Sequence, residues 1–131
     1  NKIKDNILPI AIAAFDNMSA RKEMFNNWKK LNNKEIFIDG RLSATIYQVF
    51  TVTNDRIEAY EKTLFDDNEV EEGPCTFKQT AHFAGLIGAR ITHILTNYLS
   101  NKYSNENIMN VPYLIEEYGD PFLIKVLYEP I

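Results

Sequence analysis

Several residue types that mark common functional classes are scarce in this chain of 131 residues. The single cysteine, Cys75, excludes an internal disulfide, and one thiol with two histidines is too small a set for a structural zinc site. Five glycines are too scattered to write a P-loop or a G-x-G-x-x-G motif. His82 and His93 are too far apart along one helix to share an ion, so we expect surface or core histidines.

Long apolar runs and excess positive charge are also missing. No segment approaches the roughly 20 apolar residues that span a bilayer, and the residues before the first apolar run do not have the pattern expected of a signal peptide. A net charge of −4 gives no electrostatic reason to expect a nucleic-acid partner. We therefore expect one cytoplasmic domain over residues 1–131, without a membrane or a nucleic acid as partner.

The apolar and β-branched segments that are present predict the strands of a mixed sheet. These segments are 7–15, 35–39, 45–53, 113–118 and 122–128. The first, ILPIAIAAF, is nearly all apolar, which predicts a strand in the middle of a sheet with both faces covered. We expect Gly40 to end the second strand in a turn, so that Asp39 and Arg41 pair with each other or face solvent. Gly119-Asp120-Pro121 predicts a closing hairpin.

Helical periodicity appears twice. Apolar residues recur from Met18 to Leu31, and a longer pattern runs from Thr76 to Ser100. Gly85 and Gly88 lie inside the longer pattern, where glycine costs roughly 1 kcal/mol relative to alanine, so we expect tight packing there. Residues 57–65 fit a short helix or an extended segment equally, while 66–74 and 101–110 read as loops. The order β-α-β-β-(α)-α-β-β predicts an α/β fold.

Two positions have residue types and neighbours that favour chemistry. Asp16 and Asn17 follow the first strand, where such side chains cap a helix or hold a ligand such as Mg²⁺ on a nucleotide phosphate. Arg21, one turn later, could pair with phosphate or with Asp16. Cys75 directly precedes a helix, whose N-terminal amides lower the pKa of a thiol, and Lys78 could assist the thiolate. An inert thiol is the alternative.

The ordered combination of these residues resembles the ThiF/MoeB/HesA family and its ubiquitin-activating relatives. In that family a buried strand ends in D-N-x-x-x-R, as in Asp16 to Arg21. A cysteine on a mobile crossover loop follows at an interval similar to that of Cys75, and a helix with small residues comes next. FIDGRL, residues 37–42, is also similar to a strand of some members. The resemblance covers about residues 7–100; residues 101–131 add a loop and the closing hairpin.

The resemblance implies a fold, an activity and partners. The fold would be the C-terminal half of a ThiF-type domain, a partial Rossmann-like three-layer fold with a mixed sheet. The family uses ATP and Mg²⁺ to adenylate the C-terminal carboxylate of a small ubiquitin-like or sulfur-carrier protein, and it forms homodimers. By this resemblance Asp16 would hold Mg-ATP, Asn17 and Arg21 would complete the cofactor site, and Cys75 would be the catalytic nucleophile.

The departures from the family pattern define what this chain lacks. The glycine-rich nucleotide loop of the family lies upstream of the D-N motif and does not occur in these residues, nor do the arginine and lysine that contact the triphosphate. We therefore expect a longer parent enzyme to be active and this chain alone to bind ATP poorly. The alternatives are a non-catalytic dimerisation or partner-binding domain derived from the same fold, and an unrelated α/β domain.

Overall fold

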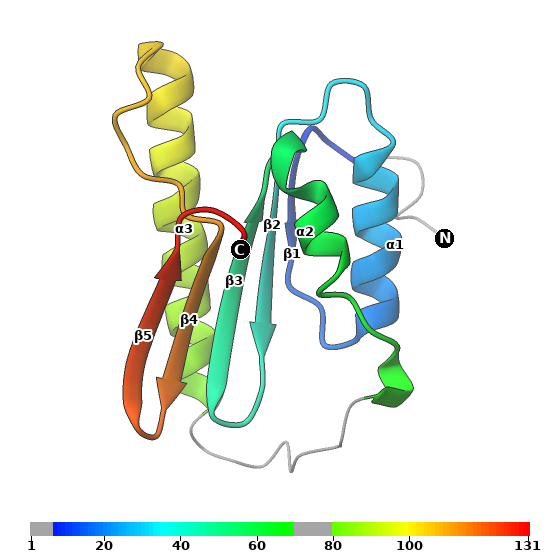
Figure 1. Cartoon of the computed structure of the whole chain (residues 1–131), viewed down its shortest axis with the longest axis vertical. Helices are drawn as coiled ribbons and strands as arrows, with labels where there is room; N and C mark the ends of the chain where they lie inside the picture. Colours follow the sequence, from blue (N-terminus) through cyan, green and yellow to red (C-terminus); the bar gives the residue numbers. More distant parts are fainter. Residues whose placement is uncertain (1–6, 70–79) are drawn as a thin grey trace.

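The computed structural model describes residues 7–69 and 80–131 and confirms an α/β fold with a five-stranded mixed sheet (Figure 1). The elements in chain order are β1 (Ile10–Ala13), α1 (Met18–Lys29), β2 (Ile36–Leu42), β3 (Ile46–Val52), η1 (Asn54–Arg56), α2 (Ile57–Glu61), η2 (Asp67–Glu69), α3 (Thr80–Ser104), β4 (Leu114–Gly119) and β5 (Phe122–Leu127). Of residues 57–65, which the sequence left open, residues 57–61 form the short helix α2 and the rest is not helical.

The sheet keeps the strands in chain order, β1-β2-β3-β4-β5. β1 and β2 run parallel and are joined through α1, whereas each later pair is antiparallel. The closing hairpin, β4 and β5, is confirmed, and the Asp120-Pro121 peptide bond in its turn is cis. The chain therefore begins as a parallel β-α-β unit and ends as an antiparallel meander.

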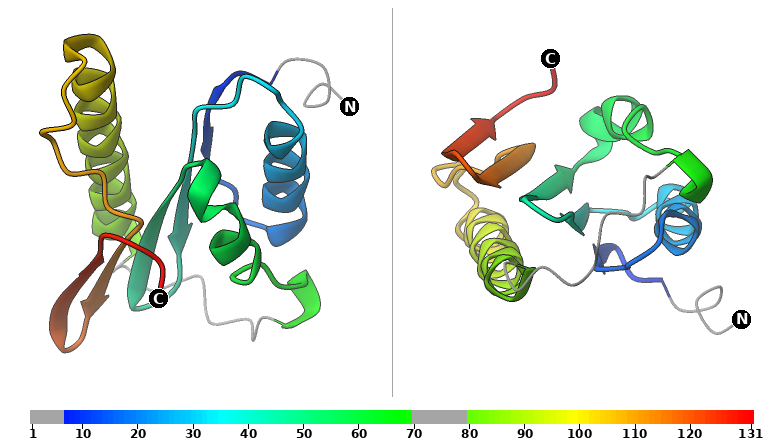
Figure 2. Two further views of the ribbon diagram at one scale, coloured as in Figure 1. Left: turned by 45° about the horizontal axis from the view of Figure 1, so that its top comes forward. Right: turned by 90° about the horizontal axis from the view of Figure 1, so that it is seen from below.

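Helices cover the sheet from both sides. Figure 2 shows α3 on one side and α1 with α2 on the other. Alternation along β2 sends Phe37 and Asp39 toward α1 and α2, and Ile36 and Ile38 toward α3, as expected for successive strand residues. We call these the α1/α2 side and the α3 side of the sheet.

The α1/α2 side has an aromatic core. Phe25 and Trp28 of α1 are fully buried against Phe37, and the Phe25 ring lies 4.7 Å from that of Tyr60 on α2. The indole of Trp28 donates a hydrogen bond to the Pro9 carbonyl at 2.9 Å, which satisfies its polar atom inside the core. This packing fixes the parallel β1-α1-β2 unit.

The α3 side has an aliphatic core, formed where α3 crosses β2 and β3. Ile87, Ile91 and Ile94 of α3 pack against strand residues that include Ile36, Ile38 and Val49. Gly40 lets the helix approach closely, because a Cβ at this position would lie 2.6 Å from Ile87 Cγ2. The prediction that Gly40 ends β2 in a turn is therefore wrong: β2 continues through Gly40 to Leu42.

The predicted central position of the first strand is also wrong. β1 is an outer strand with β2 as its only neighbour in the described sheet, and Ile12 is 41% exposed. The apolar run indicated burial by side chains, which α1 provides for Ala11 and Ala13. Coverage of a face and position in the sheet are separate properties, and composition reports only the first.

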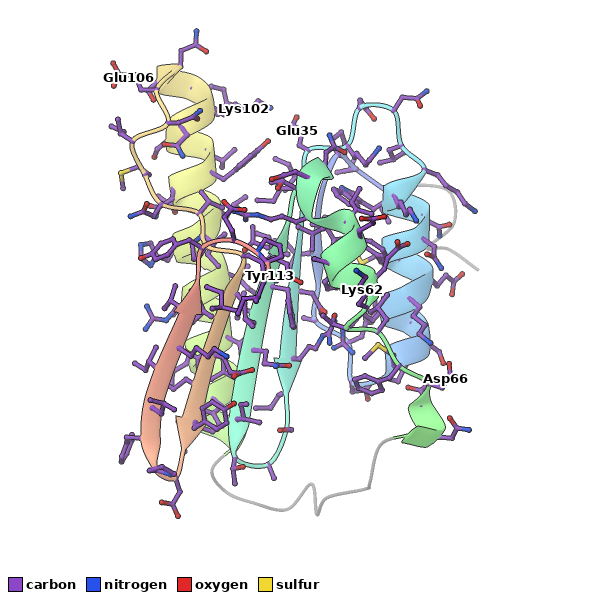
Figure 3. All side chains as sticks on the ribbon, in the orientation of Figure 1. Glu35, Lys62, Asp66, Lys102, Glu106 and Tyr113 are labelled. Atoms are coloured by element: carbon purple, nitrogen blue, oxygen red, sulfur yellow. The ribbon has the colours of Figure 1, made fainter. Side chains whose placement is uncertain are left out.

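Two expectations for the long helix need correction. Gly85 and Gly88 are exposed and a Cβ on either would meet nothing within 4 Å, so they do not mark tight packing. The helix also runs past Ser100 to Ser104, ending before Asn105, which has the left-handed φ of 59° found after many helix ends. In Figure 3, Lys102 in this last turn lies near Glu35, and the Nζ–Oε1 distance is 2.8 Å.

Candidate functional site

The sequence left two roles open for Asp16 and Asn17, capping of the next helix and binding of a ligand. The Asn17 side chain is the N-cap of α1, because its Oδ1 accepts a hydrogen bond from the Ala20 amide at 2.8 Å. Asp16 is exposed between the end of β1 and the start of α1, and its Oδ1 accepts a bond from Asn17 Nδ2 at 3.2 Å. Asn17 therefore caps the helix, which leaves the Asp16 carboxylate facing solvent.

A second carboxylate occupies the start of α1. Asp67 of η2 accepts hydrogen bonds from the Met18 amide at 2.6 Å, from the Ser19 amide at 3.2 Å and from the Ser19 hydroxyl. The bond from the Ser19 hydroxyl, followed by that from the Met18 amide, lowers the pKa of Asp67. The amides that a helix N-terminus would offer to a phosphate are thus already bonded to Asp67 and Asn17.

Arg21 points into the protein, where it meets Asp39. The Arg21 Nε lies 2.7 Å from Asp39 Oδ1, and Nη2 donates to the carbonyls of Phe15 at 2.7 Å and Gly40 at 3.3 Å. Its exposed fraction is 5%, and that of Asp39 is 0%. Arg21 thereby ties α1 to the ends of both parallel strands.

Asp39 is shared by three donors, which we call the Asp39 cluster together with it: Arg21, Arg41 and Tyr60. Arg41 Nε and the Tyr60 hydroxyl each lie 2.7 Å from Asp39 Oδ2. Arg41 also donates to the carbonyl and the hydroxyl of Thr63, at 3.0 and 2.9 Å. Burial, followed by the charge of Asp39, raises the pKa of Tyr60, so its hydroxyl stays protonated and donates.

One feature of the sequence indicates the Asp39 cluster. An aspartate inside the apolar strand FID would be buried on the α1/α2 side, where a carboxylate needs a cationic partner. The expected pairing of Asp39 with Arg41 is confirmed. The contribution of Arg21 was missed, because the partners expected for it were phosphate and Asp16.

Of the three residues predicted for a Mg-ATP site, Asp16 has an exposed carboxylate, whereas Asn17 caps α1 and Arg21 is buried. Mg²⁺ commonly takes one or two carboxylates and completes its shell with water and phosphate oxygens, so exposed Asp16 suits a single ligand. Residues 7–69 and 80–131 contain no group of three or more His, Cys, Asp or Glu side chains that could hold a metal by itself. The two predicted residues Cys75 and Lys78 lie outside the described residues.

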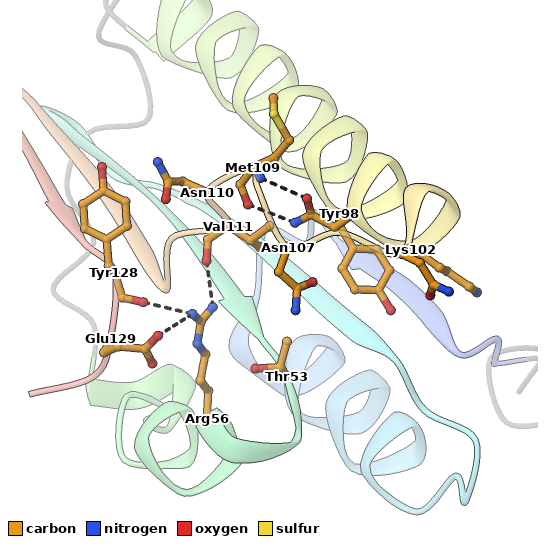
Figure 4. A pocket seen from close by; sticks show the side chains of 12 residues that line it. Thr53, Arg56, Tyr98, Lys102, Asn107, Met109, Asn110, Val111, Tyr128 and Glu129 are labelled. Atoms are coloured by element: carbon orange, nitrogen blue, oxygen red, sulfur yellow. Dashed lines mark hydrogen bonds and ion pairs between the residues drawn. The ribbon is translucent and has the colours of Figure 1, made fainter.

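A polar cleft of about 860 Å³ opens at the other end of the sheet (Figure 4). Its wall is formed by the last turn of α3, the loop after it, and Arg56 with Tyr128 and Glu129. Arg56 is 7% exposed and donates to the carbonyls of Val111 at 3.1 Å and Tyr128 at 2.9 Å. Arg56 therefore joins the start of β4 to the segment that follows β5.

The cleft has little net charge of its own. Lys102 is paired with Glu35, whose pKa is lowered by the hydrogen bond from Lys102 and then by that from Tyr98. Arg56 lies 3.2 Å from a Glu129 carboxylate oxygen. The Asn101 side chain bonds both the amide and the carbonyl of Met109, as a neighbouring strand would. Paired charges and amide groups suit a neutral polar ligand such as a peptide backbone.

The structure keeps the cleft apart from Asp16. Asp16 follows the carboxyl end of β1, which is parallel to β2. The cleft includes Thr53 at the carboxyl end of β3, and β3 runs opposite to β2. Figure 1 shows these two places at opposite ends of the sheet, so they form two separate sites.

Comparison of the chain with protein-family models, with curated proteins and with solved structures gives no match. None of the helices in the described ranges is both long and apolar enough to cross a bilayer.

Proposed function

We propose that this chain is the C-terminal part of an ATP-dependent adenylyltransferase that activates the C-terminal carboxylate of a small ubiquitin-like or sulfur-carrier protein. The carrier carboxylate attacks the α-phosphate of ATP, which forms an acyl-adenylate and releases pyrophosphate. In this proposal Asp16 is the carboxylate that holds Mg²⁺, and the metal neutralises charge on the triphosphate when it is bound.

The position of Asp16 is the observation that carries the proposal. The side chain is exposed at the carboxyl end of a strand that is parallel to its neighbour and leads into a helix. Ligands of open α/β folds bind in the crevice outside these strand ends. Since Asn17 supplies the N-cap of α1, Asp16 has no evident structural task there.

Other residues of D-N-x-x-x-R support Asp16 indirectly. Asn17 fixes the first turn of α1, and Arg21 fixes the carbonyl of Phe15 next to Asp16. We therefore assign both as positioning residues and not as contacts of ATP. The phosphate cradle must come from outside these residues, because Asp67 bonds the first amides of α1.

Exchange of labelled pyrophosphate into ATP tests the proposal in the full-length protein that carries this segment. With the carrier protein present, Asp16→Asn should slow exchange about 100-fold, since metal stabilisation of a transferring phosphoryl group is worth several kcal/mol. The matched control is Glu58→Gln, a change of an exposed carboxylate on α2. Equal exchange by the wild type and Asp16→Asn would exclude Asp16 as the metal ligand.

Cys75 is the proposed acceptor of the activated carboxylate. Asp67 before it and Phe83 after it lie at the same end of the sheet as Asp16, because Asp67 bonds the start of α1 and Phe83 lies beside Gly119 at the end of β4. Cys75→Ala should leave pyrophosphate exchange unchanged and abolish a thioester that thiols cleave. A cleavable conjugate formed by Cys75→Ala at the normal rate would assign the nucleophile elsewhere.

A non-catalytic binding domain is the second candidate, favoured by the apolar side chains that β5 exposes. It makes a different prediction: neither Asp16→Asn nor Cys75→Ala alters any activity, while changes on β5 alter association. A protein that exchanges no pyrophosphate with any carrier would support this second function.

A further inference from the structure

β5 is an outer strand with a long apolar surface. Phe122, Leu123, Ile124 and Val126 are 92, 54, 54 and 39% exposed. Outer strands usually resist pairing through charges, bulges or short length, and here Lys125 is the one charged residue between Phe122 and Leu127. Figures 1 and 2 both show β5 at the border of the sheet, beyond β4.

The hydrogen bonds of β4 reveal which β5 groups face outward. The Gly119 amide donates to the Thr45 carbonyl and the Thr51 amide to the Tyr113 carbonyl, so odd-numbered β4 residues bond β3. Even-numbered β4 residues then bond β5, and their partners there are Leu123, Lys125 and Leu127. The backbone groups of Phe122, Ile124 and Val126 therefore point to the free edge.

Among the symmetric registers that use this free edge, the one centred on Ile124 pairs residues 122–126 without placing like charges opposite each other. A two-fold axis perpendicular to the sheet through Ile124 places Ile124 opposite its own copy and Phe122 opposite Val126 of the second copy. Leu123 then opposes Lys125. Shifting the axis to Lys125 would place two lysines directly opposite each other, which destabilises a strand pair. Shifting it to Leu123 would pair only residues 122–124 within β5, and shifting it to Val126 would pair only residues 125–127.

The same register also places Phe122 beside a cavity of the second copy. Phe122 pairs with Gly119, whose Cβ direction points to Phe83 of α3, so Phe122 faces the α3 side. A cavity of about 330 Å³ lies on that side at the other end of β5, with Ile94, Ile115 and Val126 in its wall. Antiparallel pairing therefore brings each Phe122 next to the cavity of the other copy.

We propose that β5 pairs with β5 of a second copy of this chain, which makes a continuous ten-stranded sheet with each Phe122 seated at the partner's α3–β5 cavity. The interface is self-complementary, as a two-fold axis requires. The exposed apolar β5 side chains supply roughly 400 Å² per copy, about half of a standard interface, and the cavity walls add to it. This pairing does not depend on the adenylyltransferase function.

Cysteine crosslinking tests the register directly. In a Cys75→Ser background, Ile124→Cys should form a disulfide-linked dimer on mild oxidation, because directly opposite hydrogen-bonded residues have Cα atoms about 5.5 Å apart. Leu123→Cys is the matched control. Its two copies are offset by two residues, about 6.6 Å along the strands, which puts the Cα atoms beyond disulfide range. Equal crosslinking at both positions would overturn the proposal.

Sedimentation of single variants tests the side chains and the backbone. Phe122→Asp should raise the dimer dissociation constant at least about tenfold, since it replaces an apolar contact by a buried charge. Leu123→Asp, with its side chain opposite the partner's Lys125, should leave the constant unchanged or lower it. Ile124→Pro should give a monomer with an intact hairpin, because the lost amide faces the free edge.

Several results would contradict self-pairing. These are a wild-type protein that stays monomeric at about 100 µM, equal weakening by Phe122→Asp and Leu123→Asp, and an unchanged dimer in Ile124→Pro. A monomer whose β5 amides are protected only by another protein would assign this edge to that partner. None of these results bears on pyrophosphate exchange, so failure here and failure of the proposed activity are distinguishable.

Discussion

The two sides of the sheet differ in how completely they are covered. On the α1/α2 side an aromatic core surrounds a carboxylate that is fully buried and shared by three donors. On the α3 side a single helix packs on β2 and β3, while Phe122, Ile124 and Val126 of β5 stay exposed. A helix about 10 Å wide covers roughly two strands spaced 4.8 Å apart, so one helix cannot cover five.

This difference suggests that the α1/α2 side stabilises the fold, whereas the α3 side near β5 is open to partners. The Asp39 cluster joins α1, α2 and β2 through largely buried hydrogen bonds, so its removal should lower the free energy of unfolding strongly. The flank of α3 near β5 contributes little to that unit and is where association should act. Changes on the two sides should therefore have different consequences, which the following variants measure.

The largest loss of stability is expected for Asp39→Ala. The change leaves Arg21, Arg41 and the Tyr60 hydroxyl buried without their acceptor, and breaking a buried charge pair in this way costs about 3–5 kcal/mol. Urea denaturation followed by Trp28 fluorescence measures the loss. Glu58→Gln, on the exposed face of α2, serves as control and should change the free energy of unfolding by less than about 0.5 kcal/mol. An equally small change in the free energy of unfolding for Asp39→Ala would show that the Asp39 cluster does not stabilise the fold.

Gly40→Ala should give the next largest loss. The new methyl group would lie 2.6 Å from Cγ2 of Ile87, a stiff β-branched side chain, and overpacking of this kind costs about 1–3 kcal/mol. The same substitution at Gly88 is the matched control. That position is exposed in α3 with nothing within 4 Å of its Cβ direction, so Gly88→Ala should stabilise by up to about 1 kcal/mol. In urea denaturation, Gly40→Ala should lower the free energy of unfolding and Gly88→Ala should raise it. Changes of the same sign would contradict the packing described for α3.

The elements were largely predictable from local patterns, whereas their partners were not. Alternation and helical periodicity indicated the strands, α1 and the closing hairpin, because these signals depend on neighbouring residues. The outer position of β1 and the close approach at Gly40 depend on distant segments that no local pattern reports. Arg21 was expected to pair with phosphate or with Asp16, although the chain folds it onto Asp39.

A smaller effect, dependent on pH, is expected at Asp67. Its folded pKa lies below the ordinary value of 3.8, so its contribution to stability is present above that value and is lost as the pH falls through the folded pKa. Asp67→Ala should therefore lower the melting temperature at pH 7, and the two melting curves should converge as the pH falls to about 2. Asn68→Ala, an exposed neighbouring change, should show no such convergence. A melting difference for Asp67→Ala that is constant with pH would assign the effect to packing and not to charge.

The smallest effect on stability is expected for Asp16→Asn, which sharpens the contrast with Asp39. Asp16 precedes α1 in the chain and Asp39 follows it in β2, which is parallel to β1. Asp16 differs in being exposed, and Asn17 already caps the helix. Its free energy of unfolding should match that of the wild type within about 0.5 kcal/mol. Asn17→Ala should cost about 1 kcal/mol, because it removes the acceptor of the Ala20 amide. If urea denaturation instead shows that Asp16→Asn lowers the free energy of unfolding as much as Asn17→Ala does, Asp16 belongs to the helix cap. The proposal would then lose its best-placed carboxylate for Mg²⁺.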